Sequence, residues 1–370
     1  MAADPLISVV MSVFNGERFL REAMESILNQ SFGDFELIVI DDGSTDGSAE
    51  ILSSLAGQDS RVQVHWQPNR GLVEALNRGF GLGRGKYIAR MDADDIAVRD
   101  RLLRQSSFLE RNPEVGVVGG AIQRIDSAGT PLEVKHYART DAEIKAALFR
   151  NCSELAHPAV LIRKEVFVQT GGYRAAFVDA EDYDLWLRIA EYCQLANLDE
   201  ILLKYRVHPA QITRTKLRQQ ALSVLAAKAL AVSRKQGGTG EPSWQGGVTA
   251  ATLCALGVDE ATQQSTVGAA HLFWIKCLSR WGQNANALEL AAEMSRICQR
   301  EHLDRWVVAD TNLALARIYW SQKKFARSIA SAAHGVITWP LMLARPMKPL
   351  LRGLQKALQT HSSPVSAAGQ

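Results

Sequence analysis

The chain has 370 residues, of which 47% are hydrophobic and 22% charged, and these proportions exclude disordered, collagen-like and coiled-coil proteins in favour of about two globular domains. The formal charge of +3 is unevenly divided: residues 1–202 contain 21 Lys and Arg against 31 Asp and Glu, and residues 203–370 contain 21 against 8. The basic half therefore suits an anionic partner. No run approaches the roughly 18 apolar residues that cross a bilayer. The first residues lack a signal-peptide pattern, so we expect a cytoplasmic protein.

Strand and helix patterns alternate through the first 200 residues, which is typical of βαβ units. The predicted strands are Ile7–Val13, Glu36–Ile40, Val62–Trp66 and Tyr87–Met91, with amphipathic helices between them. A helix at 100–111, a strand at Val115–Val118 and a hairpin through Asp126–Thr130 follow in a less regular order. We expect an α/β fold in which helices flank a mixed, mainly parallel sheet.

A second domain is predicted from about Lys216, where the sequence becomes rich in Ala and Leu with a helical pattern. Residues 237–247 (GGTGEPSWQGG) are typical of a flexible linker. We therefore expect an α/β domain over 1–212 and an all-α accessory domain over 213–370, with the linker near 237–247. Within the second domain, residues 313–337 predict a helical hairpin.

Three of the first four predicted strands end in polar or acidic residues, namely Phe14-Asn15, Asp41-Asp42 and Asp92-Ala93-Asp94-Asp95. Ligands of open α/β sheets bind beyond the carboxyl ends of the strands. Five carboxylates at one edge repel one another unless a cation neutralises them, and carboxylate oxygens favour Mg²⁺ or Mn²⁺ together with substrate phosphates. The pattern predicts a divalent metal and a diphosphate-bearing substrate. Alternatively, Asp42, Ser44 and Asp46 form a turn and helix cap that needs no ligand.

Six ordered blocks carry a resemblance to a known family: ISVVMSVFNGERFLREAMESILNQSFGDFELIVIDDGSTDGS, NRGLVEALNRGF, GKYIARMDADDIAVRDRL, HPAVLIRKEVF, GGYRAAFVDAEDYDLWLRIA and YRVH. Over residues 6–212 the sequence resembles the inverting glycosyltransferases of family 2, which have a GT-A fold. The resemblance implies a nucleotide-diphosphate sugar donor, bound by the first half of the domain, and an acceptor bound by the second half. It also implies bacterial polysaccharide synthesis with a glycan or lipid-linked acceptor.

The resemblance assigns roles to residues in the first half. Asp42 matches the base-recognition Asp, and Ser12 and Phe14 match positions that line the base pocket, where the family usually has Pro and Tyr. Arg70 and Asn77 lie in the block that borders the nucleotide and diphosphate; a surface guanidinium and a plain helix amide are the alternatives.

The metal is assigned to the Asp-x-Asp pair. Asp94 matches the direct ligand of Mn²⁺ or Mg²⁺, Asp92 lies nearer the ribose or sugar and also serves the metal, and Asp95 orients them. His208 in YRVH resembles a position that helps to coordinate the metal or diphosphate in some members of the family, with a turn residue before Pro209 as the alternative.

Asp182 matches the general base of the family. Inverting transfer needs a carboxylate that takes the proton of the attacking acceptor hydroxyl. Helix neighbours do not share a face, so one of Glu181 and Asp182 faces the acceptor, and the resemblance favours Asp182. The alternative is an acidic first turn of a helix over Tyr183–Tyr192, stabilised by the helix dipole.

Residues 311–370 contain eight Lys and Arg and no Asp or Glu. Mixed with Trp339, Leu341, Leu343, Leu350, Leu351 and Leu354, these cations predict an interfacial helix on an anionic membrane, peripheral at the inner face of the plasma membrane. A solvated basic face of a helical domain is the alternative.

Three other functions compete with the glycosyltransferase interpretation. A sugar-phosphate nucleotidyltransferase needs a Gly-rich basic loop after the first strand, and an Asp-nucleophile phosphatase needs its Asp pair there; FNGERF is neither. A catalytically inactive scaffold with a GT-A-like core is the non-enzymatic alternative, and the acidic residues at 42, 92, 94 and 182 argue against it. No nucleic-acid-binding module is recognised, so we expect no nucleic-acid partner.

Overall fold

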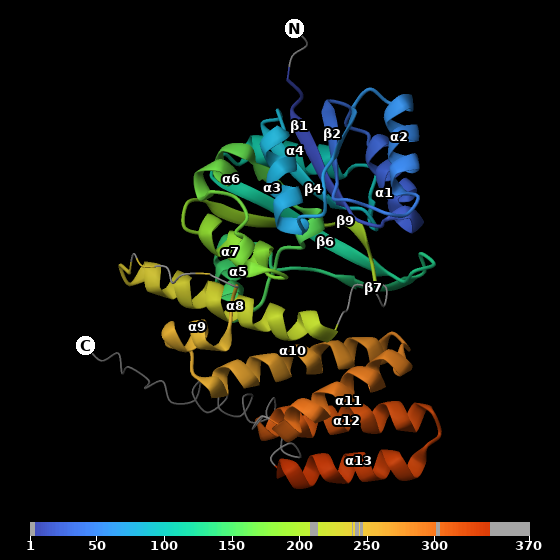
Figure 1. Cartoon of the computed structure of the whole chain (residues 1–370), viewed down its shortest axis with the longest axis vertical. Coiled ribbons are helices and arrows are strands. Elements are labelled where there is room, and N and C mark those ends of the chain that lie inside the picture. Colours follow the sequence, from blue (N-terminus) through green and yellow to red (C-terminus); the bar gives the residue numbers. More distant parts are fainter. Residues whose placement is uncertain are drawn as a thin grey trace, which may run out of the picture. The chain divides into compact units, whose positions relative to one another are not determined.

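The structure is a computed structural model, and it describes residues 4–207, 214–238, 240, 244, 247–300 and 304–340. The chain divides into two compact units, residues 1–259 and residues 260–370, shown in sequence colours in Figure 1. Within the described ranges, no helix is both long and apolar enough to span a membrane.

The first unit is built around one mixed sheet. Its strands are β1 (Ile7–Val13), β2 (Phe35–Asp41), β3 (Val62–Trp66), β4 (Tyr87–Asp92), β5 (Ile96–Ala97), β6 (Val115–Ile125), β7 (Pro131–Lys135), β8 (Leu161–Arg163) and β9 (Gln194–Arg206). The strand order is β3-β2-β1-β4-β8-β6-β9-β5, and β7 pairs with β6. Strands β1 to β4 are parallel, β8 is antiparallel to both of its neighbours, and β6 and β9 are parallel. The expected mixed, mainly parallel α/β sheet is confirmed.

Helices cover both faces of the parallel half, which explains its uninterrupted apolar strands. The helices are α1 (Glu17–Leu28), α2 (Ser48–Gln58), α3 (Leu72–Leu82) and α4 (Arg101–Arg111). Helices α1, α2 and α4 share one buried cluster with Val9 and Met11 of β1. On α3, Ala75 packs with Ile38 and Ile40 of β2, which belong to the opposite face. Because side chains alternate along each strand, they contribute to two separate apolar layers, one on each face of the sheet.

The second half of the unit adds the helices α5 (Asp141–Leu148), α6 (Lys164–Thr170) and α7 (Glu181–Ile189), with single 3₁₀ turns at His157–Ala159 and Ala175–Phe177. The strand expected at Val115–Val118 extends to Ile125, and β6 and β7 form the expected hairpin. Helix α7 begins two residues before the expected Tyr183 and ends at Ile189.

The first unit extends beyond the boundary expected after residue 212. Helices α8 (Arg214–Lys235) and α9 (Ala250–Ala255) belong to it. On α8, the side chains of Gln220 and Ser223 donate hydrogen bonds to the carbonyls of Asp179 and Val178, at 2.9 and 3.1 Å. In the segment expected to be a flexible linker, Trp244 packs edge-on against a buried ring of this unit, Phe177.

The second unit is all-α in its described residues. It contains α10 (Glu260–Arg280), α11 (Asn284–Arg300), α12 (Arg305–Ser321) and α13 (Phe325–Thr338). Helices α12 and α13 form the helical hairpin expected at 313–337, and Lys323 in its turn has a positive φ of 59°. Ser328 donates to the carbonyl of Ala316 across the hairpin, and at Gly335 a Cβ atom would lie 2.9 Å from the carbonyl oxygen of Ala309, so the helices meet at small residues.

Two glycines of α3 offer a matched test of how closely this helix packs on β1. A Cβ atom at Gly79 would lie 2.4 Å from Cγ1 of Val10, whereas one at Gly81 would meet no atom within 4 Å. We expect Gly79→Ala to lower the free energy of unfolding by about 1–3 kcal/mol through overpacking. The control Gly81→Ala should leave stability unchanged or raise it by up to about 1 kcal/mol, because Ala is the better helix former. Urea unfolding followed by circular dichroism measures both; equal effects would contradict the close packing.

Candidate functional site

Three carboxylates gather where β4 ends. Asp92 is the last residue of β4, and Asp94 and Asp95 lie in the turn before β5. One oxygen from each of the three lies within 4.8 Å of the others, and we call Asp92, Asp94 and Asp95 the acidic loop. The register places Ser12 of β1 beside Asp92, so the predicted Ser12 position adjoins this loop.

One carboxylate of the acidic loop retains an unused oxygen. Oδ1 of Asp95 accepts a hydrogen bond of 2.8 Å from the backbone N–H of Arg206, whereas its fully buried Oδ2 has no hydrogen-bond partner among the described residues. Burial, together with the charges of Asp94 and Asp92, raises the pKa of Asp95 well above its ordinary value. Clustered carboxylates with an orphaned oxygen fit a hard divalent cation, so the residues present suit Mg²⁺ or Mn²⁺.

Arg90 supplies charge compensation from inside the sheet. This almost fully buried guanidinium lies 2.5 Å from Oδ2 of Asp92. Burial raises the pKa of Asp92, and the positive charge of Arg90 opposes that rise. Behind it, the buried Arg101 donates to the carbonyl oxygen of Arg90 at 2.8 Å and pairs with Gln105, and burial lowers the pKa of Arg101 to about 9. Arg101 thus holds the backbone of β4, and Arg90 in the same strand balances the charge of Asp92.

Arg206, the last residue of β9, fixes the acidic loop from the other side. Besides its backbone bond to Asp95, its Nε donates to the carbonyl oxygen of Asp94 at 2.8 Å. Its Nη2 donates to Glu22 at 2.6 Å, and its guanidinium stacks 4.4 Å from the ring centroid of Phe19, both on α1. Arg206 lies in the YRVH block, but its role was not expected from the sequence, because a single arginine in a strand pattern does not reveal its partners.

Asp42 orders the turn that leads into α3. Its buried carboxylate accepts hydrogen bonds from the side chain of Gln67 (2.7 Å) and from the backbone N–H groups of Arg70 and Gly71 (both 2.8 Å). The backbone of Arg70 is thus fixed while its side chain is exposed. The predicted contact of Asp42 with a nucleobase stays a prediction.

The segment after Asp42 ties the first two loops together. Ser44 accepts from the backbone N–H of Asn15 at 3.0 Å, and Ser48 accepts from that of Gly16 at 2.9 Å. Asp46 accepts from the N–H of Glu17 at 3.0 Å. The polar side chains of DGSTDGS therefore serve a contact between loops, and α2 is capped by Gly47 without a side-chain cap.

Exposed aromatic rings flank this edge of the sheet. Phe14, directly after β1, and Trp66, at the end of β3, each expose 54% of their surface. Phe14 was expected to line a base pocket, and its exposure leaves the ring face accessible. Trp66 therefore lies at the surface, whereas Trp186 of α7 is fully buried.

Asn77 clamps the backbone of a loop from the second half of the unit. Its Nδ2 donates to the carbonyl of Tyr173 and its Oδ1 accepts from the N–H of Tyr173, each at 2.9 Å. The hydroxyl of Tyr173 is in turn 2.7 Å from Nε2 of the buried His157. Burial lowers the pKa of His157 well below its ordinary value. Asn77 and His157 thus position Tyr173, and burial raises the pKa of its hydroxyl well above the ordinary value.

Asp182 lies in the first turn of α7 and belongs to the same electrostatic neighbourhood as the acidic loop. Burial raises its pKa, Arg90 opposes the rise and the charge of Asp92 adds to it. One oxygen of Asp182 accepts from the N–H of Tyr183 at 2.7 Å. Beside it, burial and the charge of Asp182 raise the pKa of Glu181 to about 8. The fold thus brings together carboxylates that are 90 residues apart in the sequence.

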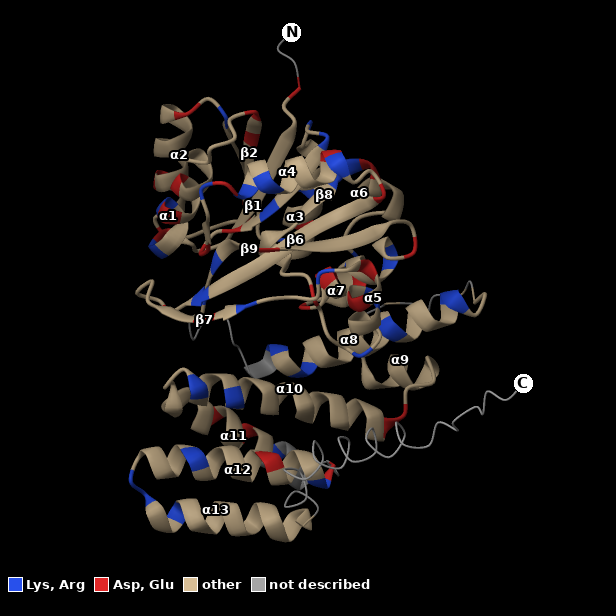
Figure 2. Ribbon diagram, turned by 180° about the vertical axis from the view of Figure 1, so that it is seen from behind, with Lys and Arg blue, Asp and Glu red and all other residues tan. Residues whose placement is uncertain are grey.

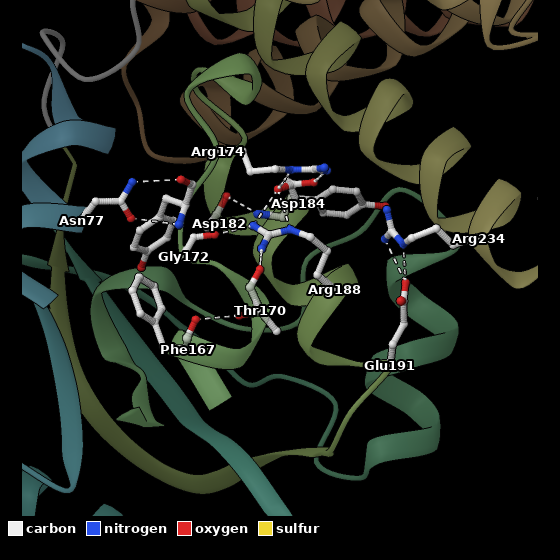
Figure 3. A network of polar contacts seen from close by, with 12 residues as sticks. Asn77, Phe167, Thr170, Gly172, Arg174, Asp182, Asp184, Arg188, Glu191 and Arg234 are labelled. Atoms are coloured by element: carbon white, nitrogen blue, oxygen red, sulfur yellow. Dashed lines mark hydrogen bonds and ion pairs between the residues drawn. The ribbon is translucent and has the colours of Figure 1, made fainter. Parts of the chain in front are cut away.

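The position of α7 is fixed by the arginine clamp shown in Figure 3, formed by Arg174, Asp184 and Arg188. The buried carboxylate of Asp184 accepts from Nε of Arg174 at 2.9 Å and from Nη2 of Arg188 at 2.8 Å. Arg188 also donates to the carbonyls of Thr170 and Gly172, at 2.6 and 2.7 Å. Because Asp184 is two residues after Asp182, the clamp fixes the helix turn that carries the expected base.

His208 lies outside the described residues, so its predicted role at the metal stays a prediction. The described strand β9 ends at Arg206, two residues before it.

The chain matches known proteins in sequence. A family model described as "Glycosyl transferase family 2" matches residues 8–171. An O-antigen biosynthesis glycosyltransferase of Escherichia coli, WbnJ, is 35% identical over 207 residues, which cover 55% of this chain and 80% of the relative. An uncharacterized glycosyltransferase of Methanocaldococcus jannaschii is 32% identical over 223 residues, covering 59% of this chain and 76% of the relative.

Solved structures share the fold. The mannosyltransferase PcManGT from Pyrobaculum calidifontis, in complex with GDP-Man and Mn²⁺, superposes with a TM-score of 0.50 at 18% identity, over 92% of this chain and 88% of that one. TarS 1–349 of S. aureus gives a TM-score of 0.50 at 15% identity, over 88% and 90%. The likeness to these two structures supports the expected GT-A-like fold, and the sequence matches show that the chain belongs to glycosyltransferase family 2.

Proposed function

We propose that this glycosyltransferase moves a sugar, with inversion, from a nucleotide-diphosphate sugar to an acceptor hydroxyl in a divalent-metal-dependent reaction. The observation that carries the proposal is the joint placement of the acidic loop and Asp182 around the buried Arg90. The first suits a metal-bound diphosphate and the second suits a general base.

The acidic loop is the proposed metal site. Asp94 and Asp92 would hold Mn²⁺ or Mg²⁺, with Asp95 behind them, and the ion would supply positive charge to the diphosphate. Arg206 holds the backbone of this loop in place by its contacts with Asp94 and Asp95. We extend the proposal to Asp42, Ser12 and Phe14 as the nucleotide side, because all three lie at the carboxyl ends of β1 and β2.

Asp182 is the proposed base. As the acceptor oxygen forms its bond to the anomeric carbon, the hydroxyl proton passes to Asp182 and the bond to the diphosphate breaks, with its electron pair leaving on the diphosphate oxygen. Single displacement of this kind inverts the anomeric centre and needs no enzyme nucleophile. Burial raises the pKa of Asp182, which makes its carboxylate a stronger base.

The setting proposed is polysaccharide or lipid-linked glycan synthesis. The Escherichia coli relative carries an O-antigen biosynthesis name, and the Pyrobaculum neighbour holds GDP-Man and Mn²⁺. The first supports a glycan acceptor for this chain, and the second supports a nucleotide-sugar donor.

The proposal is tested by thermal-shift measurements with UDP-, GDP- and dTDP-sugars, each with and without Mn²⁺. We expect one nucleotide to raise the melting temperature only when the metal is present, because bound ligand stabilises the folded state by mass action. That result would identify the nucleobase of the donor. No response to any donor from folded protein, with no transfer detected, would favour the inactive-scaffold alternative.

Substitutions separate the two acidic groups. We expect Asp94→Ala to weaken Mn²⁺-dependent donor binding by at least about tenfold through loss of a charged ligand. By contrast, Asp182→Asn should retain donor binding and lower kcat by about 10²–10⁴-fold, the usual worth of a general base. Calorimetry gives the affinities and product formation gives kcat. The exposed Asp199→Asn is the control, and equal loss of donor binding in both site variants would contradict the separate roles.

The Glu181 pKa predicts a pH dependence of stability. Because the folded protein raises this pKa from 4.5 to about 8, it holds the proton more tightly than the unfolded chain. The free energy of unfolding should therefore fall as pH rises from about 4.5 to about 8, and Glu181→Gln should remove this contribution. Urea unfolding across that window should show that the free energy of unfolding of Glu181→Gln rises relative to that of the native protein as pH rises. The exposed Glu165→Gln is the control, and parallel pH curves for Glu181→Gln would refute the assignment.

A further inference from the structure

Helix α13 has an apolar face that no described element covers. Its outward residues are Ala326, Ile329, Ala330, Ala333 and Ile337, which we call the α13 outer face, and all five are exposed. Ile329 and Ile337 expose 64% and 77% of their surface. The opposite side of the helix, with Ser328 and Gly335, packs on α12. Long aliphatic side chains presented in this way by a solvent-facing helix mark an interaction surface.

Aromatic side chains extend this face at the start of α13. Phe325 and Trp320, from the end of α12, are 49% and 61% exposed, and their rings pack edge-on at 5.0 Å. Amphipathic aromatic rings are suited to the boundary between headgroups and acyl chains.

The charged residues beside the α13 outer face are all cationic. Arg317, Lys323, Lys324 and Arg327 are exposed, and no ion pair of these four is seen in the part of the chain that the structure describes. From residue 311 onward the sequence contains no Asp or Glu. Figure 2 shows blue and no red on α13 and on the turn that precedes it. The occupant of this face must therefore be apolar at its centre and anionic around it.

We propose that the α13 outer face docks on an anionic lipid bilayer, with the aliphatic residues in the interface and the four cations at the headgroups. Long cationic side chains at the edge of a helix can reach headgroups while their neighbours enter the apolar layer. A second copy of the chain fits less well, because pairing two such faces would bring like charges together without acidic partners. Of the residues expected earlier to form an interfacial helix, all but Trp339 lie outside the described residues, so the proposal rests on α12 and α13 alone.

The test is flotation of the full-length protein with phosphatidylcholine vesicles, with and without phosphatidylglycerol. We expect binding only to the anionic vesicles, and at least about tenfold weaker binding for the Ile329→Asn and Ile337→Asn double variant. The triple variant Lys323→Gln, Lys324→Gln and Arg327→Gln should lose binding and its salt dependence. Val168→Asn, a 65% exposed aliphatic position on α6, is the control and should bind as the native protein does. Circular dichroism confirms folding.

Several results would overturn the proposal. Equal binding to both vesicle types would exclude recognition of anionic lipid. If the isoleucine variant binds anionic vesicles as well as the native protein does, vesicle binding would be assigned to residues 341–370 and not to the α13 outer face. Absence of vesicle binding, with a concentration-dependent dimer that the isoleucine variant abolishes, would identify a second copy as the occupant. None of these readouts depends on transferase activity, so failure here is distinct from failure of the proposed reaction.

Discussion

Compensation of buried carboxylates by guanidinium groups is the interaction on which the candidate site depends. Asp92 and Asp95 are removed from water beside one another, and burial alone would favour their neutral forms. Arg90 faces Asp92 from inside the sheet, and Arg206 binds the loop from β9. A divalent cation would complete the same compensation, because the protein leaves one oxygen of Asp95 without a partner among the described residues.

Rigid supports surround this charge balance. Asp42 fixes the turn into α3, Asn77 fixes Tyr173, and the arginine clamp fixes the first turn of α7. Asp42 and Asn77 join segments that are far apart in the chain, whereas the contacts of the arginine clamp lie within residues 170–188. Because packed elements hold their side chains more precisely than free loops do, the proposed metal and base groups are positioned before any ligand binds.

The sequence predicted the parallel strands well because they are buried on both faces and read as continuous apolar runs between turn signals. The acidic residues were placed at one edge because the ends of parallel strands meet there. The supports were not foreseen: Asp42 and Asn77 were assigned to ligands, yet their side chains also bind backbone groups. Arg206 and Arg101 were missed, since a guanidinium partner found across the sheet leaves no periodic pattern. The packing of α8 on the first unit was also missed, because the hydrogen bonds of Gln220 and Ser223 to distant carbonyls leave no pattern in the sequence.

The pairing of β9 has a consequence for the order in which the molecule is assembled. Strand β9 lies parallel to β6 and antiparallel to β5, and it supplies the arginine that holds the acidic loop. A nascent chain that ends before this strand contains every acidic residue of the loop but lacks Arg206, which binds the loop. Such long-range pairing forms slowly compared with local contacts. We therefore expect the acidic loop to be fixed late in folding, after strands β1 to β4 have paired.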